Sequence, residues 1–477
     1  MGSFTHSPGG QAGLRIVIMS ARAQPSAGDP SAAPSAASAG GRRRPRLGRA
    51  VWLVLLAALA IRLAFVLATP GYELVHDARD YDRHAASLAA GDGYAPSLGR
   101  PTAFRPPGYP YLLAGVYKLA GVDTRLDPDG ILAARLTGVL LGTLTVALIG
   151  VLAAQLWDRR AALVAMALAA VYVPLILVGA AVMSETLFVT LLLATLVAGM
   201  AHRRSRHRYR WALFAGVLAG LAILTRANAA VLLLPLGLAV WDARPRFTLR
   251  ALGPPAALVV TAILVVTPWT VRNQVVFGTF VPVSTQVGSA LAGTYNDQAR
   301  TDEENPASWR SVRHIPEYDR IWASVSTRPE PELDHELRDI AKRYIAQHPG
   351  YVAEVGWWST ARMLDLTGLK WSRHTMGTIG IEPRWADVSV ACFWAFALLA
   401  LAGAFTRRAR QAPLFVWLVP VLMYLSVVFL VVETPRYRTG IDPFIVMLAA
   451  LALLSAADAR AGFRRRGARG SPAPVPR

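Results

Sequence analysis

The chain has 477 residues, of which 54% are apolar and only 17% are charged, and its mean hydropathy is +0.36. The apolar residues form long blocks, which indicates bilayer spans and excludes an ordinary soluble enzyme. A net charge of +20 would suggest nucleic-acid binding in a soluble protein, but here the basic residues lie between apolar blocks, so we predict no nucleic-acid partner. The single cysteine, Cys392, excludes intrachain disulfides and cysteine-based metal sites.

Residues 1–45 are rich in Ala, Ser, Pro and Gly, a composition that predicts a disordered cytoplasmic tail. Ten apolar blocks follow, most of them long enough to cross the hydrocarbon core as a helix. They lie at about 51–69, 131–156, 161–180, 185–201, 211–225, 227–241, 252–271, 388–405, 413–432 and 439–457.

Arginine placement orients these blocks in the membrane. The connections 157–160, 202–210, 242–250 and 406–411 and the tail after residue 455 each carry at least two arginines. Because positively charged loops stay in the cytoplasm, this pattern places those connections and both termini there. The predicted fold class is an all-α polytopic membrane protein with about ten transmembrane helices, located in the inner (plasma) membrane.

Two polar segments, about 70–130 and 272–387, fall on the outer side and are too long to be simple linkers. The first predicts a short interfacial helix at 77–90, closed by Gly91, and the second predicts a charged helix at 331–347. The chain is accordingly divided into a tail (1–45), an N-terminal transmembrane catalytic module that includes the first outer loop (46–271), an outer subdomain (272–387), C-terminal transmembrane helices (388–457) and a basic cytoplasmic tail (458–477).

Some arginines lie near the outer ends of the predicted spans, where the positive-inside trend disfavours them. These residues are Arg62, Arg135, Arg226, Arg272, Arg436 and Arg438. Interface snorkelling, or pairing with a nearby acid, would explain any single one. Because a planar guanidinium can hold a phosphate bidentately, their gathering at one membrane level favours binding of an anionic lipid phosphate.

Two acids oppose these arginines. Asp77 opens the predicted helix after the first span and shares a helix face with Tyr81, four residues on. Asp80 and Asp82 lie one step round the helix and are expected to be solvated. Glu185 lies at the outer mouth of the fourth span. A helix-capping role would explain either Asp77 or Glu185 taken alone.

In their order and spacing, four stretches resemble the GT-C superfamily of integral-membrane glycosyltransferases. The similar branch holds the protein O-mannosyltransferases (glycosyltransferase family 39) and the lipid A aminoarabinose transferase. The stretches are the first outer loop (His76-Asp77-Ala78-Arg79-Asp80-Tyr81, Gly91-Asp92-Gly93-Tyr94 and Arg105-Pro106-Pro107-Gly108-Tyr109-Pro110), Ser184-Glu185, Pro268-Trp269-Thr270-Val271-Arg272-Asn273 leading to Phe280-Val281-Pro282-Val283-Ser284-Thr285, and Glu433-Thr434-Pro435-Arg436-Tyr437-Arg438. The loop departs from the family at Ala78, where many relatives carry a second acid.

The resemblance implies an inverting transfer of a sugar, such as mannose or arabinose, from a polyprenyl-phosphate donor at the outer face of the membrane. The acceptor would be a hydroxyl of an unknown protein, glycan or lipid. Asp77 would be the general base and Glu185 a supporting acid, while Tyr81 and Tyr437 would join the arginines in binding substrate. No cofactor is certain, and a divalent metal ion with Glu185 as its candidate ligand stays open.

Two other functions stay open from the sequence. A transporter or flippase of lipid-linked sugars would share the many spans and buried charges, although such proteins usually show internal repeats and binding sites in broken helices at mid-membrane. Here the acids and arginines gather instead at one face, beside two large loops. A non-catalytic scaffold that binds polyprenyl lipids is the third alternative, which only activity of the purified protein separates from an enzyme.

Overall fold

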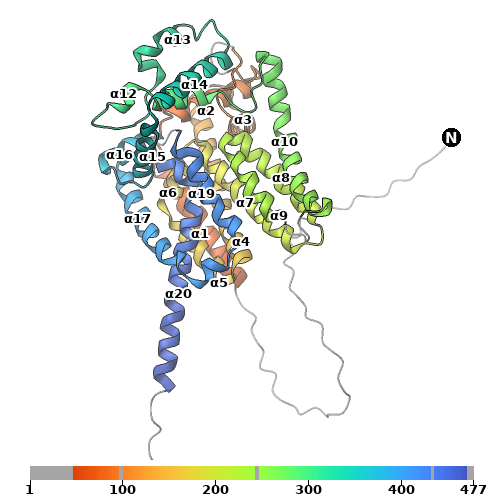
Figure 1. The fold of residues 1–477 in the computed structure, drawn as a ribbon. Coiled ribbons are helices and arrows are strands. Elements are labelled where there is room, and N and C mark those ends of the chain that lie inside the picture. Colours follow the sequence, from red (N-terminus) through yellow and green to blue (C-terminus); the bar gives the residue numbers. More distant parts are fainter. Residues whose placement is uncertain (1–46, 96–99, 242–246, 431–434, 470–477) are drawn as a thin grey trace, which may run out of the picture. The chain divides into compact units, whose positions relative to one another are not determined.

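The computed structural model of the chain describes residues 47–95, 100–241, 247–430 and 435–469 (Figure 1). They belong to one compact unit that begins at Leu47. Within these ranges the regular structure is helical and contains no β-strand. The predicted all-α class is therefore confirmed, whereas the tail predicted at 1–45 lies outside the described residues.

Among the described residues, six helices are long and apolar enough to cross a membrane. They are α1 (Leu47–Leu67), α4 (Pro128–Leu156), α7 (Ser184–Arg204), α10 (Leu249–Phe277), α17 (Arg384–Ala404) and α20 (Asp442–Arg469). A seventh span results if α5 (Arg159–Val171) and α6 (Val173–Ala180), which meet at an angle of 56°, cross together. The break falls beside Pro174, which cannot donate a backbone hydrogen bond to the preceding turn.

The remaining three of the ten predicted spans also form helices. These helices are shorter than the six candidate spans, or they begin with charged residues. They are α8 (Arg208–Thr225), the 3₁₀ helix η1 (Ala227–Leu232) continued by α9 (Leu233–Val240), and α19 (Leu414–Val428). The helices thus confirm a polytopic membrane protein, while the count of ten spans stays a prediction.

Small residues let the membrane helices approach one another closely. The largest apolar cluster joins α4, α5, α7, α8, α9 and α20 and is rich in alanine. Where α4 meets α6, a Cβ added at Gly138 would lie 2.1 Å from the carbonyl oxygen of Gly179. Helices associate in lipid through such close backbone contacts. The hydrophobic effect contributes little to their association, because the lipid tails around them are as apolar as the side chains.

The first polar segment forms two helices, α2 (His76–Ala90) and α3 (Gly108–Ala120), which pack together through tyrosines and small apolar residues. The predicted helix at 77–90 is confirmed, and its cap Gly91 has a left-handed backbone with φ 91°. Asp82, expected to be solvated, is instead fully buried. Its carboxylate accepts hydrogen bonds from Tyr117 Oη at 2.8 Å and Leu126 N at 3.0 Å, because α3 packs over that side of α2.

The second polar segment contains several short helices, and α14 confirms the charged helix predicted at 331–347. Its helices are α11 (Gln286–Thr294), α12 (Asp297–Arg300), η2 (Val312–His314), η3 (Pro316–Tyr318), α13 (Asp319–Ala323), α14 (Glu330–Gln347), α15 (Pro349–Met363) and α16 (Leu369–Gly377). In Figure 1 these helices lie with α2 and α3 at one end of the bundle. Glu330 ties the two polar segments together, since its carboxylate accepts from Thr102 Oγ1 at 2.5 Å and from Ala103 N at 2.9 Å.

Two short helices complete the C-terminal part, α18 (Arg407–Gln411) between α17 and α19, and the 3₁₀ helix η4 (Pro435–Gly440) before α20. η4 carries the arginines of the fourth stretch, but Glu433 and Thr434 of that stretch lie outside the described residues. η4 packs against α6, α7, α15, α19 and α20, so its side chains reach both the first polar segment and the membrane core.

Candidate active site

Asp77 stands in the first turn of α2, but it does not cap that helix. Val75 is the N-cap residue, and no side chain makes a capping hydrogen bond there. His76 has φ 40°, an uncommon conformation for a non-glycine residue, where strain often accompanies function. The Asp77 carboxylate instead accepts two charge-assisted hydrogen bonds, Oδ1 from Arg105 Nη2 at 2.6 Å and Oδ2 from Arg436 Nη2 at 2.5 Å.

Arg105 is a site residue that the sequence analysis missed, although its motif was quoted. It also binds Asp80, with 2.6 Å between Nε and Oδ2, and its guanidinium carbon lies 5.2 Å from the centre of the Tyr81 ring. Gly108 explains how the loop reaches this place, because a Cβ there would lie 2.7 Å from Thr225 Oγ1. The loop that carries Arg105 can therefore press directly against the end of α8.

Glu185 forms the second half of the site. It lies in the first turn of α7 without capping it, and its side chain is 2% exposed. Its Oε1 lies 2.9 Å from Arg226 Nη1 and 3.6 Å from Arg436 Nε. Arg436 therefore bridges the two acids predicted from the sequence, Asp77 and Glu185.

Aromatic and hydroxyl groups fill the space between these charges. Tyr81 Oη donates to Ser184 Oγ at 3.0 Å, on the residue next to Glu185. The Tyr437 ring lies against two guanidinium groups, with the central carbons of Arg226 and Arg436 each 5.2 Å from its centre. The structure thus brings Asp77, Tyr81, Glu185, Arg226, Arg436 and Tyr437 into one cluster, to which it adds Arg105, Asp80 and Ser184; we call these nine residues the ionic cluster.

Electrostatics hold Asp77 of the ionic cluster in its charged form. Burial would raise the pKa of Asp77, but the guanidinium groups of Arg105 and Arg436 lower it well below its usual range. Burial would likewise lower the pKa of Arg436, but Asp77 and then Tyr437 and Glu185 raise it. Within the described residues, buried Arg436 Nε and Glu185 Oε1 have no hydrogen-bond partner of good geometry. Both atoms are ion-paired, since Glu185 Oε1 lies 2.9 Å from Arg226 Nη1 and 3.6 Å from Arg436 Nε, so the cluster contains charged groups whose hydrogen-bonding capacity is not fully used.

Two predicted arginines lie outside the cluster, among the membrane helices. Arg62 donates to the carbonyl oxygens of Ala58, Ala169 and Ala170, at 3.2 to 3.3 Å. Arg135 donates to the carbonyl oxygens of Ala180 and Thr69, at 3.0 and 2.8 Å, and to the Thr69 hydroxyl. Their contacts join helix ends to one another, and phosphate binding by either stays a prediction.

Arg272 and Arg438 also lie apart from Asp77. Arg272 donates to the Thr102 carbonyl oxygen at 2.8 Å and its guanidinium carbon lies 4.8 Å from the centre of the Trp269 ring, so it holds the first polar segment against α10. Arg438 is enclosed by Asp365 and Asp442, at 3.0 and 3.1 Å. Donor binding by these two stays a prediction as well.

Metal binding with Glu185 as a ligand stays a prediction. Hard cations such as Mg²⁺ take several oxygen ligands, yet the described residues contain no group of three His, Cys, Asp or Glu side chains placed to hold an ion. Glu185, the candidate ligand, turns Oε1 towards two guanidinium groups.

A cavity of about 850 Å³ opens beside the ionic cluster. Its lining includes Asp80 and Arg105 of the ionic cluster, residues of α13 and α14, and the end of α10. Most of the lining surface is apolar, and Phe104, Trp309 and Trp322 are among the residues that contribute to it. Its volume is in the usual range for a ligand pocket, roughly 300–1,000 Å³.

A family model matches part of the chain. Residues 104–271 match the family model of dolichyl-phosphate-mannose-protein mannosyltransferases. The matched region contains Arg105, Glu185 and Arg226 of the ionic cluster. No curated protein sequence matches the chain significantly.

Solved structures of an archaeal oligosaccharyltransferase share the fold, and a bacterial protein shows a weaker similarity. The archaeal oligosaccharyltransferase AglB from Archaeoglobus fulgidus, in complex with an inhibitory peptide and a dolichol-phosphate, is 14% identical with a TM-score of 0.51, over 89% of this chain and 52% of that one. Its apo form is 12% identical with a TM-score of 0.52, over 91% and 53%. ArnT from Cupriavidus metallidurans bound to undecaprenyl phosphate is 16% identical with a TM-score of 0.40, over 84% and 77%.

The chain spans about half the length of the archaeal oligosaccharyltransferase. At these identities the likeness to the archaeal enzyme establishes the fold alone. Together with the family match, it confirms the predicted resemblance to the GT-C superfamily of membrane glycosyltransferases.

Proposed function

We propose that this protein is a glycosyltransferase that moves a sugar from a polyprenyl-phosphate donor to an acceptor hydroxyl, with inversion. The observation that carries the proposal is the contact between Asp77 and Arg436 inside the ionic cluster. Asp77 is a carboxylate that can accept a proton, and Arg436 is a cation that can bind phosphate. The two side chains are joined by a hydrogen bond. The family match to dolichyl-phosphate-dependent mannosyltransferases supports a lipid-phosphate donor.

Arg436 and Arg226 are the groups that would bind the donor phosphate. Both lie against Tyr437, and Arg436 Nε has a free hydrogen-bonding position among the described residues. Guanidinium groups bind phosphate oxygens through paired N–H donors and stabilise the charge that develops as the phosphate leaves. Glu185 would hold both arginines in place from its buried position.

Asp77 would act as general base, but only after its ion pairs loosen. A base works best when its pKa is near the working pH, and the two arginines lower the pKa of Asp77 well below its usual range. A donor phosphate that draws Arg436 towards itself would raise the pKa of Asp77 again. Asp77 then takes the proton of the acceptor hydroxyl, whose oxygen bonds to the anomeric carbon as the bond from that carbon to the phosphate oxygen breaks. One displacement of this kind inverts the anomeric centre and needs no covalent nucleophile.

The remaining predicted residues take supporting roles in this proposal. Tyr81 lines the sugar side of Asp77, since its ring lies beside Arg105 and its hydroxyl reaches Ser184. Arg438 would fix the turn that carries Arg436. The acceptor would enter through the large cavity, whose lining includes Asp80 and Arg105.

The proposal places this chemistry at the outer face of the plasma membrane. Cysteine labelling tests the sidedness in a Cys392→Ser background, with Glu303→Cys in the second polar segment and Arg206→Cys between α7 and α8; both replaced positions are exposed. We expect an impermeant maleimide added to intact cells to label position 303 and not position 206. Labelling at 206 alone would place the ionic cluster on the cytoplasmic side.

Transfer itself is tested with the purified protein and radiolabelled polyprenyl-phosphate mannose or arabinose. A transferase releases polyprenyl phosphate and passes the label to an acceptor in a membrane extract. A flippase or a lipid-binding scaffold would bind the same donor without breaking the bond between sugar and phosphate. Binding without cleavage of either donor, in the presence of the extract, would therefore favour those alternatives.

A further inference from the structure

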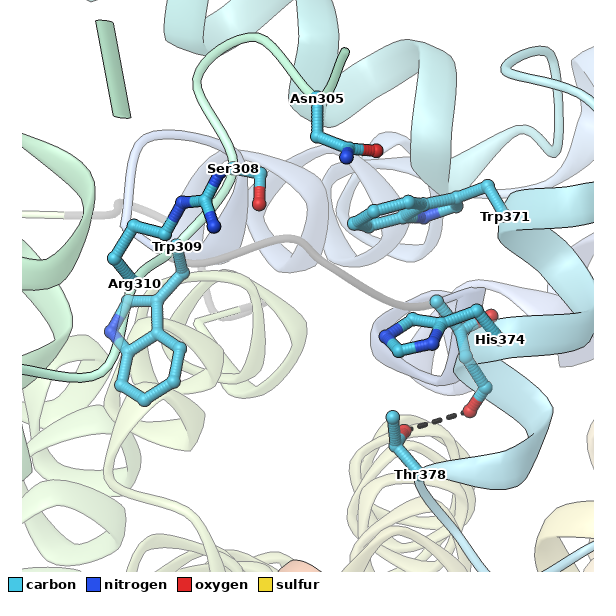
Figure 2. A pocket seen from close by; sticks show the side chains of 8 residues that line it. Asn305, Ser308, Trp309, Arg310, Trp371, His374 and Thr378 are labelled. Carbon is cyan, nitrogen blue, oxygen red and sulfur yellow. Dashed lines mark hydrogen bonds between the residues drawn. The ribbon is translucent and has the colours of Figure 1, made fainter. Parts of the chain in front are cut away.

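A second, smaller pocket lies wholly within the second polar segment. It has a volume of about 200 Å³. In Figure 2, the segment 305–310 forms one side and α16 the other, with Trp309 and Trp371 on opposite sides. The lining residues are Asn305, Ser308, Trp309, Arg310, Trp371, His374, Thr375 and Thr378.

Both tryptophans are held in place by their neighbours. Trp309 Nε1 donates to the Ser289 carbonyl oxygen at 3.1 Å. The guanidinium carbon of Arg362 lies 5.0 Å from the centre of the Trp371 ring. Ala307 has φ 55°, a strained conformation for a residue with a Cβ, and it turns the chain just before Ser308 and Trp309. Strain of this kind is often kept where a side chain must be presented to a ligand.

The polar groups of the pocket suit hydroxyl groups better than charged ones. Thr375 Oγ1 donates to the Ser372 carbonyl oxygen at 3.0 Å, and Thr378 Oγ1 to that of Thr375 at 2.7 Å, which leaves the lone pairs of both hydroxyls as acceptors. The charge of Arg310 is matched by its ion pair with Asp302. With Asn305 added, the pocket offers both donors and acceptors and little net charge.

This combination of flat indole faces and mixed polar edges matches the surface of a sugar ring. A pyranose has apolar C–H faces, which can pack on indole, and a rim of hydroxyls that both donate and accept. The volume of about 200 Å³ is below the roughly 300–1,000 Å³ of pockets for drug-sized ligands, so it suits a single ring.

The pocket also adjoins the path to the ionic cluster. Trp309 lines both the small pocket and the large cavity, and Asp80 and Arg105 of the ionic cluster are also among the residues that line the large cavity. A saccharide chain seated against Trp309 could therefore continue through the large cavity towards Asp77.

We propose that the pocket between Trp309 and Trp371 binds one neutral pyranose unit of a saccharide-bearing acceptor. The acceptor role of the bound saccharide rests on the proposed transferase function. Binding of the sugar ring itself can be measured without any transfer. The chemistry that recognises the unit is packing of its C–H faces on indole, with hydroxyl contacts to Asn305 and Thr375.

The test is saturation-transfer NMR on the detergent-solubilised full chain, with methyl mannoside, methyl glucoside and N-acetylglucosamine as probes and glycerol as negative control. We expect the ring protons of at least one sugar to receive saturation from the wild type and from Asp77→Asn. Trp371→Ala should weaken that binding about fivefold, as expected for loss of an aromatic contact worth about 1 kcal/mol. Trp357→Ala, at a tryptophan that is 68% exposed on α15, is the matched control and should leave binding unchanged.

Asn305→Ala provides a second variant in case Trp371→Ala does not fold, and it should weaken binding as well. Absence of saturation transfer from the wild type to all three sugars would overturn the subsite, and so would wild-type binding by both variants. Transfer activity without sugar binding would sink this subsite and leave the proposed function standing. If sugar binding depends on Trp371 but the protein has no transfer activity, the sugar-binding site would be supported and its role in binding an acceptor would be wrong.

Discussion

Arg436 and Arg438 stand two residues apart in η4, yet their surroundings are opposite. The side chain of Arg438 is 2% exposed and lies between Asp365 and Asp442, with its guanidinium carbon 3.4 Å from the centre of the Phe393 ring. Arg436 is 12% exposed, binds Asp77 and keeps Nε without a hydrogen-bond partner among the described residues. One arginine is fully satisfied by the protein, and the other has capacity left.

The difference shows what marks a ligand-binding arginine. Both residues oppose the positive-inside trend in the same way, so their place in the sequence does not separate them. They differ in the residues that other elements bring into contact with them. The end of α15 and the start of α20 enclose Arg438, whereas residues of α2 and α7 contact Arg436 in a partly open cluster. The following predictions are ordered from the largest expected effect to the smallest.

The first prediction sharpens the catalytic side of the comparison. Asp77→Asn keeps the shape of the side chain but removes the base, so turnover should fall by about 10²–10⁴. Donor binding should stay close to wild type and the protein should still fold, with a lower thermal midpoint because Asp77 loses its ion pairs with Arg105 and Arg436. Asp129→Asn, at an exposed acid in the first turn of α4, is the control and should keep full activity. Near wild-type turnover by Asp77→Asn would make Glu185 the next candidate.

The second prediction tests the structural side. Arg438→Met leaves Asp365 and Asp442 buried without their cation, which typically destabilises a protein by about 3–5 kcal/mol. We expect Arg438→Met to have a clearly lower thermal unfolding midpoint in detergent, measured by tryptophan fluorescence. Arg436→Met should lower that midpoint much less. If Arg438→Met unfolded like the wild type and lost donor binding instead, the two arginines would have exchanged roles.

The third prediction concerns donor affinity. Hydrogen bonds to charged groups contribute about 1.5–3 kcal/mol each, so Arg436→Ala should weaken binding of a polyprenyl-phosphate sugar by about tenfold to a hundredfold. Microscale thermophoresis with a fluorescent donor measures this directly. Arg272→Ala, at an arginine held by Thr102 and Trp269, is the matched comparison. Equal weakening by both variants would show that the phosphate contacts are spread beyond the ionic cluster.

The fourth prediction is a shift in pH dependence. Because Asp77 has a lower pKa in the folded protein than in an unfolded chain, its ion pairs stabilise the fold above about pH 4 and this contribution is lost as the pH falls further. In the free enzyme Asp77 should therefore place the acid limb of kcat/KM below about pH 4. The limb of kcat should lie higher, since the bound phosphate competes for Arg436.

Replacement of Arg436 sharpens that test. Arg436→Gln removes one of the two cations on Asp77, so the acid limb of kcat/KM should move up by about one pH unit, which corresponds to roughly 1.4 kcal/mol of lost interaction. The control is Arg438→Lys, which keeps a charge outside the cluster. An unchanged limb in Arg436→Gln would mean that another group controls it.

Much of the fold and six of the nine residues of the ionic cluster could be predicted because they depend on local patterns. Apolar blocks predict membrane helices wherever the chain is long enough, and Gly91 predicts the end of α2 because a left-handed residue suits glycine. Asp77, Tyr81 and Glu185 were found for a similar reason, since each follows a recognisable junction between a span and a polar segment.

The sequence by itself therefore determined the class of protein, the helices and the set of charges that are predicted to lie at one level of the membrane. Only the tertiary structure decided which charges meet. Packing of α3 on α2 buried Asp82, contact of Gly108 with α8 brought in Arg105, and the surroundings of η4 divided Arg436 from Arg438. These outcomes depend on contacts between residues far apart in the chain, which set the partners of each charge and with them its desolvation, its pKa and its capacity for a ligand.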